Sequence, residues 1–184
     1  MAYTESTMLS LGTKAPDFTL PDTISGQDIH LGALPPASAT LVMFLCNHCP
    51  YVLHVNPEIV RLEAAFAPLG VRFLGISAND AEKYPEDGPE NMTRHAAETG
   101  YRFPYLYDKS QAVAKAYDAA CTPDFYLFDG GLRLVYRGRL DASRPSNGKS
   151  LDGADLRRAI EAVLKGGTPE SVQYPSGGCN IKWK

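Results

Sequence analysis

The sequence has no long hydrophobic run and no cluster of basic residues. No stretch approaches the ~18 consecutive apolar residues of a membrane-spanning helix, and residues 1–20 lack the basic segment and apolar core of a secretory leader. The formal net charge is −3 and the pI is near 5.8, so electrostatics do not favour nucleic acid or an anionic membrane as a partner. We therefore expect a cytoplasmic protein with no nucleic-acid and no membrane partner.

Cysteine is also scarce. Four cysteines in 184 residues are too few to build a small secreted protein held together by disulfides. Two of them, Cys46 and Cys49, nevertheless lie close together in the motif C-N-H-C, which Pro50 follows directly. In such a chain a close pair favours a reactive or metal-binding role over a structural disulfide.

The length and composition are those of one folded domain. Hydrophobic residues make up 44% of the 184 residues and charged residues 21%, which is the balance of a globular protein. The sequence contains no internal repeat and no low-complexity segment. We expect a single domain over residues 1–184, with a core at about 11–166 and an irregular C-terminal tail at 167–184.

The C-N-H-C motif lies between a predicted buried strand and a predicted helix. Residues 39–45 (ATLVMFL) form an unbroken apolar run, which is typical of a strand buried on both faces. From Pro50 to Leu69 apolar residues recur every three or four positions, the period of an amphipathic helix, which Gly70 then ends. Residues 71–77 (VRFLGIS) predict a second buried strand, parallel to the first and joined to it by a right-handed crossover.

The remaining patterns enlarge this unit into an α/β protein. They predict an N-terminal hairpin over 15–31, helices over 89–99 and 110–120, a short strand over 105–108, an antiparallel hairpin at Asp129–Gly131 and a last helix with Asp152 as its N-cap. A parallel strand-helix-strand unit followed by helix, hairpin and helix is the order of the thioredoxin fold. We expect a thioredoxin-like fold with a central mixed sheet, flanking helices, an N-terminal hairpin and a helix-strand insertion.

Two cysteines at a strand-to-helix turn suit thiol–disulfide exchange. The unpaired N–H groups and the positive dipole at a helix N-terminus favour a thiolate over a thiol. We expect Cys46 to attack a substrate disulfide and Cys49, in the first helical turn, to resolve the mixed disulfide. His48, when protonated, adds a second positive charge beside Cys46, which lowers its pKa and makes the disulfide more oxidising.

The spacing of the cysteine pair is also compatible with two roles outside redox chemistry. The cysteines can be ordinary core thiols, because a single C-x-x-C motif arises often by chance. They can also bind zinc together with His54 and either Cys121 or Cys179, but no second C-x-x-C and no H-x-x-x-H completes the usual ligand set. We therefore predict no metal and no bound cofactor.

Several segments resemble a known family, the peroxiredoxin-like (redoxin or AhpC/TSA-like) branch of the bacterial thioredoxin superfamily. The similar segments are FLCNHCPYV, APDFTL, ISANDAEKYPEDGPENM, YRGRLDASRP and GCNIKW, so the resemblance spans about Leu11 to Trp183. It implies a thioredoxin-like fold, and it implies that Thr122 and Pro123 form the cis-proline loop that packs against the dithiol. An incoming peptide would then pair with the Thr122 backbone beside Cys46.

The sequence also departs from the patterns of the families it resembles. Peroxiredoxins carry Pro-x-x-x-Thr/Ser-x-x-Cys around the reactive thiol, and neither Cys46 nor Cys49 has that proline and hydroxyl at this spacing. Leu45 replaces the tryptophan that precedes the first cysteine of thioredoxins, and Thr40 stands where thioredoxins keep a buried acid. The residue that accepts the proton of Cys49 is therefore not evident.

The other two cysteines are weaker candidates. Cys121 directly precedes Thr122, so it either relays a disulfide or is simply buried, and we favour burial. Cys179 lies in the glycine-rich tail, where it either resolves an intermediate at Cys46 or is inert.

Three polar residues are further candidates for the site. Asn79 and Asp80 follow the second buried strand at its C-terminal end, the edge where α/β proteins place their sites, although Asn-Asp is also common in loops. Arg139 ends a predicted strand, where it either stabilises an oxyanion or is simply solvated.

We expect, from these observations, a thiol–disulfide oxidoreductase that reduces or exchanges disulfides of protein or small-molecule substrates, with an unidentified electron donor. An unorthodox thiol peroxidase is the alternative, in which Cys46 or Cys49 becomes a sulfenic acid. A metal-binding or redox-sensing module built on the same loop is a third possibility.

Overall fold

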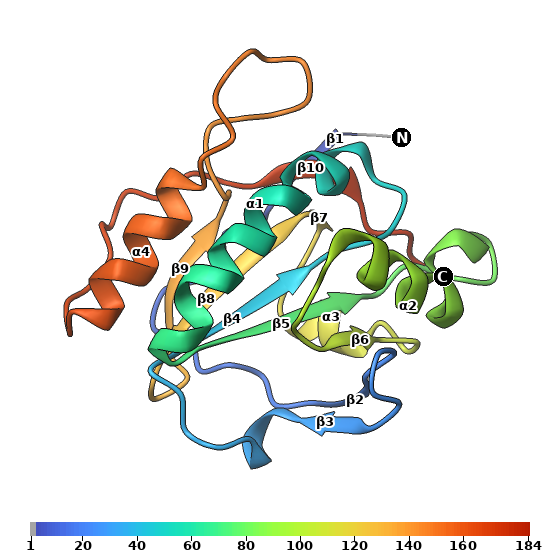
Figure 1. The fold of residues 1–184 in the computed structure, drawn as a ribbon, viewed down its shortest axis with the longest axis horizontal. Helices are drawn as coiled ribbons and strands as arrows, with labels where there is room; N and C mark the ends of the chain where they lie inside the picture. Colours follow the sequence, from blue (N-terminus) through green and yellow to red (C-terminus); the bar gives the residue numbers. More distant parts are fainter. Residues whose placement is uncertain (1–2) are drawn as a thin grey trace.

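The computed structural model describes residues 3–184, so residues 1 and 2 of the predicted domain lie outside the described residues. The central strands are β4 (Ala39–Phe44), β5 (Val71–Ser77), β6 (Tyr105–Tyr107), β8 (Asp124–Asp129) and β9 (Leu134–Gly138). They form one sheet in the order β6-β5-β4-β8-β9 (Figure 1). β4, β5 and β6 are parallel, whereas β8 is antiparallel to both β4 and β9. The sheet is mixed, as predicted.

The strand-helix-strand unit around the cysteine motif is present as predicted. Every residue of β4 is buried, and alternate side chains enter two apolar clusters on opposite faces of the sheet. The helix α1 (Pro50–Phe66) follows β4, and the short helix η2 (Ala67–Leu69) and left-handed Gly70 lead into β5. The motif therefore lies at the carboxyl end of a fully buried strand.

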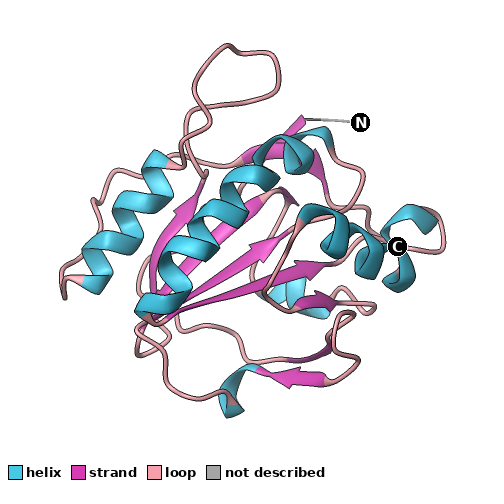
Figure 2. Ribbon diagram, viewed as in Figure 1, coloured by secondary structure: helices cyan, strands magenta, loops and turns pink. Residues whose placement is uncertain are grey.

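Helices cover both faces of the central sheet (Figure 2). One face carries α1, α2 (Pro89–Thr99) and α4 (Ala154–Leu164). The opposite apolar cluster takes side chains from α3 (Ala112–Ala116) and from the segment that holds the predicted hairpin, β2 (Thr19–Pro21) and β3 (Asp28–His30). Two single-turn helices are η1 (Leu31–Ala33) and η3 (Pro85–Asp87). No helix within residues 3–184 is long and apolar enough to cross a membrane.

A second, three-stranded sheet corrects the prediction of an irregular tail. It consists of β1 (Tyr3–Glu5), β10 (Gly177–Asn180) and β7 (Cys121–Thr122), with β10 antiparallel to both neighbours. The tail strand escaped prediction because it is short and begins with two glycines, which disfavour strands in isolation. Here glycine is needed for close approach, because a Cβ atom on Gly178 would lie 2.1 Å from the carbonyl oxygen of Thr122.

Two predicted helices begin or end elsewhere in the structure. The helix expected over 110–120 is reduced to Ala112–Ala116, because Gln111 and Asp118 adopt left-handed backbone conformations with φ of 63° and 52°. Gly153, not Asp152, is the N-cap of α4. The carboxylate of Asp152 instead accepts a hydrogen bond from the backbone N–H of Ala154 at 3.0 Å.

Candidate active site

The two motif cysteines lie between the end of β4 and the start of α1. Cys49 is the N-cap of α1, with Pro50 as the first helical residue, and Cys46 stands in the loop that precedes it. Both side chains are almost completely buried, with exposures of 1% for Cys46 and 0% for Cys49. None of the four cysteines in the described part of the chain forms a disulfide.

The loop at Thr122 packs directly against both thiols. The peptide bond between Thr122 and Pro123 is cis, as the family resemblance implied. The Thr122 hydroxyl lies 3.2 Å from the Sγ atom of Cys46, and the carbonyl oxygen of Thr122 lies 3.3 Å from the Sγ atom of Cys49, which donates to it when protonated. One residue therefore holds both cysteines of the motif in place.

Cys179 is the third cysteine of the site. The register of β10 places Cys179 opposite Thr122, and its Sγ atom lies 2.8 Å from that of Cys49. Cys179 therefore contacts Cys49 directly. The family resemblance predicts that an incoming peptide pairs with the Thr122 backbone, and in this structure β10 lies along that strand.

A buried carboxylate, absent from the residues predicted for the site, organises the motif loop. Asp87 is completely buried and accepts hydrogen bonds from the backbone N–H of Asn47 at 2.8 Å and from the Asn79 side chain at 2.7 Å. Its Oδ2 atom lies 2.8 Å from Nδ1 of His48, an ion pair without hydrogen-bond alignment. Asp87 follows β5 within ISANDAEKYPEDG, at the sheet edge where α/β sites lie, and this position is the sequence signal that could have identified it.

The ion pair between His48 and Asp87 determines which charges lie beside the cysteines. The carboxylate of Asp87 raises the pKa of His48 above its usual value, although partial burial opposes this. Burial alone would raise the pKa of Asp87, but His48 and the N–H groups of Asn79 and Asn47 keep it below its usual value. A positive charge on His48 is therefore favoured, and the carboxylate of Asp87 lies directly beside it.

The two thiols differ in pKa in the opposite sense to the prediction. The Cys46 thiol donates to Cys49 and thereby lowers the pKa of Cys49 to about 5; burial opposes the shift, whereas Cys179 and the backbone N–H of Val52 assist it. The pKa of Cys46 is raised by the same hydrogen bond, by burial and by the Asp87 carboxylate. The expected low pKa at Cys46 is wrong, because Cys46 donates the hydrogen bond to Cys49 and is buried near the Asp87 carboxylate.

One group of side chains within residues 3–184 has the spacing of a metal site. The donor atoms of Cys46, His48 and Asp87 all lie within 4.8 Å of one another. This set differs from the zinc ligands considered from the sequence, because Nε2 of His54 contacts the Ser143 hydroxyl at 2.9 Å. Three ligands are one fewer than a structural zinc site uses.

The match to a family model covers most of the chain. Residues 11–137 match the AhpC/TSA family. The chain belongs to this family. An uncharacterized conserved protein from Geobacillus kaustophilus is 54% identical to this AhpC/TSA protein, with a TM-score of 0.98 and coverage of 100% of this chain and 97% of that chain. A hypothetical protein from Sinorhizobium meliloti 1021 is 46% identical, with a TM-score of 0.96 and 98% of each chain covered.

More distant relatives carry functional names. The thiol-disulfide oxidoreductase ResA of Geobacillus thermodenitrificans is 24% identical over 140 residues, which are 75% of each chain. A thioredoxin domain of a thiol-disulfide oxidoreductase from Bacteroides vulgatus is 20% identical, with a TM-score of 0.62 over 81% of this chain and 97% of that chain. The AhpC/TSA protein thus has the predicted thioredoxin-like fold, and its distant homologues are thiol–disulfide oxidoreductases.

The remaining candidates of the AhpC/TSA protein do not touch the dithiol. The Cys121 thiol is directed at the carbonyl oxygen of Pro123 at 3.8 Å, and burial raises its pKa. Asp80 pairs with Lys83 at 3.1 Å, and its backbone N–H donates to the carbonyl oxygen of Lys182 at 2.9 Å, so it anchors the tail.

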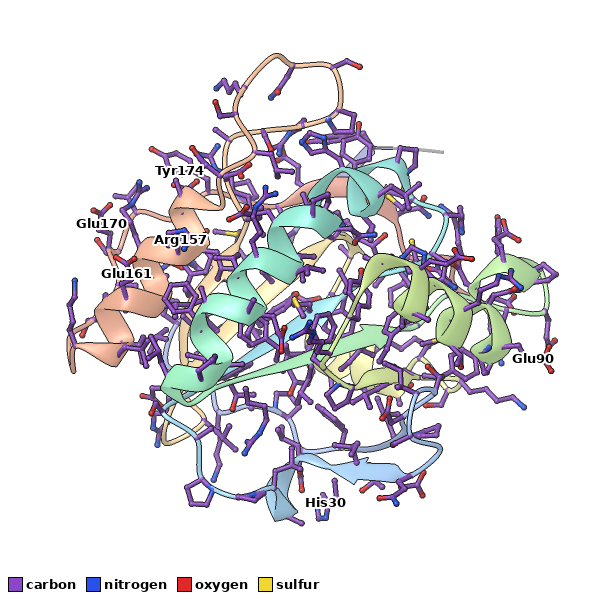
Figure 3. The ribbon with its side chains drawn as sticks, in the orientation of Figure 1. His30, Glu90, Arg157, Glu161, Glu170 and Tyr174 are labelled. Carbon is purple, nitrogen blue, oxygen red and sulfur yellow. The ribbon has the colours of Figure 1, made fainter. Side chains whose placement is uncertain are left out.

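Arg139 lies elsewhere in the AhpC/TSA protein, beside α4. Its guanidinium pairs with Asp155 at 2.6 Å and stacks on the Tyr174 ring at 4.3 Å, and Figure 3 shows Tyr174 next to α4. Of the two roles considered for Arg139, oxyanion stabilisation and simple solvation, neither describes its position, because it is held in an ion pair beside α4.

Proposed function

We propose that the protein is a thiol–disulfide oxidoreductase, with Cys46 as the nucleophile and Cys49 as the resolving thiol. The observation that carries the proposal is that both thiols contact Thr122 in the cis-proline loop, and that Cys49 lies at the N-terminus of α1. Its substrates are protein or small-molecule disulfides, and a thiol donor returns the dithiol to the reduced form. This chemistry uses no bound cofactor.

The first step joins Cys46 to the substrate. In the reduced protein the Cys46 thiol donates its hydrogen bond to the Cys49 thiolate. As the proton passes to Cys49, the Cys46 sulfur attacks one sulfur of the substrate disulfide. The substrate S–S bond breaks, a mixed disulfide forms on Cys46, and the departing sulfur takes the proton from Cys49. Cys49 is then a thiolate again.

The second step releases the reduced substrate. The Cys49 thiolate attacks the Sγ atom of Cys46, the mixed disulfide breaks, and the second substrate sulfur leaves as a thiolate. The protein is now oxidised, with Cys46 and Cys49 joined, and the substrate has gained two electrons. Because the first departing substrate sulfur has already taken the proton from Cys49, the resolving step does not need the separate proton acceptor that the sequence did not reveal.

Trapping of mixed disulfides tests the assignment. The variant Cys49→Ser should hold substrates on Cys46, where mass spectrometry identifies them, and should fail to reduce insulin. The matched control Cys121→Ser should reduce insulin like the parent protein. Trapping on Cys49 in Cys46→Ser, with none on Cys46 in Cys49→Ser, would reverse the roles of the two thiols. Absence of both trapping and disulfide reduction would reject the oxidoreductase activity.

A thiol peroxidase is a second candidate, because a hydroxyl group lies beside Cys46. The Thr122 Oγ1 atom, 3.2 Å from Cys46 Sγ, is placed to donate a hydrogen bond to a bound peroxide. The Cys46 thiolate would attack the peroxide and become a sulfenic acid, which Cys49 would convert to a disulfide with release of water. Stopped-flow mixing with hydrogen peroxide separates the two candidates, since only a peroxidase loses its Cys46 thiol rapidly.

A further inference from the structure

The position of Cys179 is fixed by the second sheet. β10 lies between β1 and β7, and Cys179 is paired with Tyr3 on one side and Thr122 on the other. The preceding residue must be glycine for this approach, because a Cβ on Gly178 would lie 2.1 Å from the backbone carbonyl oxygen of Thr122. The strand thus holds the Cys179 thiol inside the site.

Cys49 lies within reach of two different thiols. Its Sγ atom is 2.8 Å from that of Cys179, and the Cys46 thiol is its other sulfur neighbour. Cys179 is buried like the two motif thiols, and the sulfur atom in contact with it is that of Cys49. A disulfide at Cys179 is therefore expected to form with Cys49.

We propose that Cys179 is a third redox thiol, which exchanges with the oxidised motif to form an alternative disulfide with Cys49. This proposal rests on the proposed function, which supplies the oxidised motif. The Cys179 thiolate attacks the Sγ atom of Cys49, the Cys46–Cys49 bond breaks, and a Cys49–Cys179 bond forms. Cys46 leaves as a thiolate and takes up the proton that Cys179 lost. The two electrons released when the motif was oxidised stay with the substrate, so the exchange needs no further oxidant.

The exchange changes what the oxidised protein can do. With the motif disulfide, both Cys46 and Cys49 are blocked. With the Cys49–Cys179 disulfide, Cys46 is again a thiol beside Thr122, but its resolving partner is occupied. A second disulfide substrate would then remain attached to Cys46 as a mixed disulfide. The redox state of Cys179 thereby determines whether Cys46 releases its substrate or keeps it as a mixed disulfide.

A variant that keeps only two cysteines tests the new bond directly. The double variant C46S/C121S retains Cys49 and Cys179. Mild oxidation with diamide should convert these two thiols into a disulfide within one chain. Trypsin then leaves the Cys49 peptide (residues 15–61) linked to the Cys179 peptide (residues 166–182). Persistence of both thiols in this folded variant would overturn the proposal.

Matched double variants define which pair reacts. C46S/C179S retains Cys49 and Cys121 and should keep both thiols under the same conditions. C49S/C121S retains Cys46 and Cys179 and should also keep both, and equally rapid loss there would overturn the assignment of Cys49 as the shared partner. The parent protein, oxidised and digested in the same way, should yield the 15–61 and 166–182 linkage, and its absence would overturn the exchange step even if a variant misfolds.

The result is separable from that of the substrate-trapping experiment. Diamide oxidises the thiols without any substrate, so a Cys49–Cys179 bond can form even if Cys49→Ser traps nothing. That combination would reject the proposed activity and retain the third thiol. Trapping on Cys46 without any Cys49–Cys179 linkage would retain the proposed activity and reject Cys179 as a third redox thiol.

Discussion

Cys49 holds the thiolate of the dithiol because its surroundings supply hydrogen-bond donors. The Cys46 thiol is the strongest of these, and Cys179 and the Val52 backbone N–H add to it. Cys46 has the Asp87 carboxylate nearby, which opposes a second negative charge. The charge of His48 is shared with Asp87 at 2.8 Å, so it does less for Cys46 than a lone imidazolium would.

The thiolate absorbance of the reduced protein near 240 nm should titrate with a midpoint near pH 5, the pKa of Cys49. Cys46→Ala removes the main donor, so the midpoint should rise toward the ordinary thiol value. Cys49→Ser should abolish the transition, whereas Cys121→Ser should leave it unchanged. A transition near pH 5 that persists in Cys49→Ser would assign the thiolate to another cysteine.

At the scale of elements, the position of β10 depends on Gly178, which has no side chain. The carbonyl oxygen of Thr122 occupies the space that a Cβ on Gly178 would need. β10 therefore lies against the cis-proline loop only because residue 178 is glycine. We therefore expect a larger residue at position 178 to move Cys179 away from Cys49.

Gly178→Ala should lower the free energy of unfolding by about 1–3 kcal/mol, the usual cost of forcing a methyl group into filled space. It should also slow formation of the Cys49–Cys179 disulfide. Gly167→Ala is the control in the same tail, because its Cβ would meet only the Ala162 carbonyl oxygen, at 3.3 Å. Denaturant unfolding of both variants measures the difference. Equal stability of Gly178→Ala and the parent would mean that β10 contributes little.

Elements with a strong period could be predicted from the sequence. β4, α1 and β5 have apolar patterns long enough to identify. α2 could be recognised from the residues that bound it, Gly88 and Gly100, and the structure confirms all four elements. β10 could not be predicted, because four residues that begin with two glycines carry no periodicity. Its strand conformation comes from pairing with residues more than fifty positions away along the chain.

The residues of the site likewise fall into those that the sequence identifies and those that only the structure reveals. Cys46 and Cys49 could be found because spacing and position relative to a helix are local properties of the sequence. Asp87 was missed because its burial beside His48 depends on how the loop after β5 folds over the motif. The pKa order of the thiols depends mainly on the hydrogen bond from Cys46 to Cys49, and Cys179, which only the tertiary structure brings to Cys49, adds to it.

For the molecule as a whole, one buried acid links stability to pH. Asp124 begins β8 and is completely buried, and burial raises its pKa to about 8 even though Tyr126 and the Phe125 backbone N–H donate to it. The folded protein therefore binds a proton at Asp124 that the unfolded chain releases above its ordinary pKa of 3.8. This contribution weakens the fold as pH rises from about 4 to about 8.

Asp124→Asn should remove that contribution. The stability of the variant relative to the parent should therefore increase with pH between about 4 and 8, by on the order of 1 kcal/mol per pH unit. Urea unfolding of the reduced proteins at several pH values measures this difference. Asp28→Asn, at an exposed position of β3, should show no such trend. A constant difference between Asp124→Asn and the parent would contradict the raised pKa.

The second sheet has a consequence for the order in which the site is assembled. It joins residues 3–5 to residues 177–180, so it closes a loop of nearly the whole described chain, and β10 is the last of these strands to be synthesised. Contacts of such large sequence separation form late in folding. During synthesis the dithiol can already lie at the start of α1 while its third cysteine has yet to be made. The nascent chain therefore passes through a stage in which the site contains Cys46 and Cys49 but not Cys179.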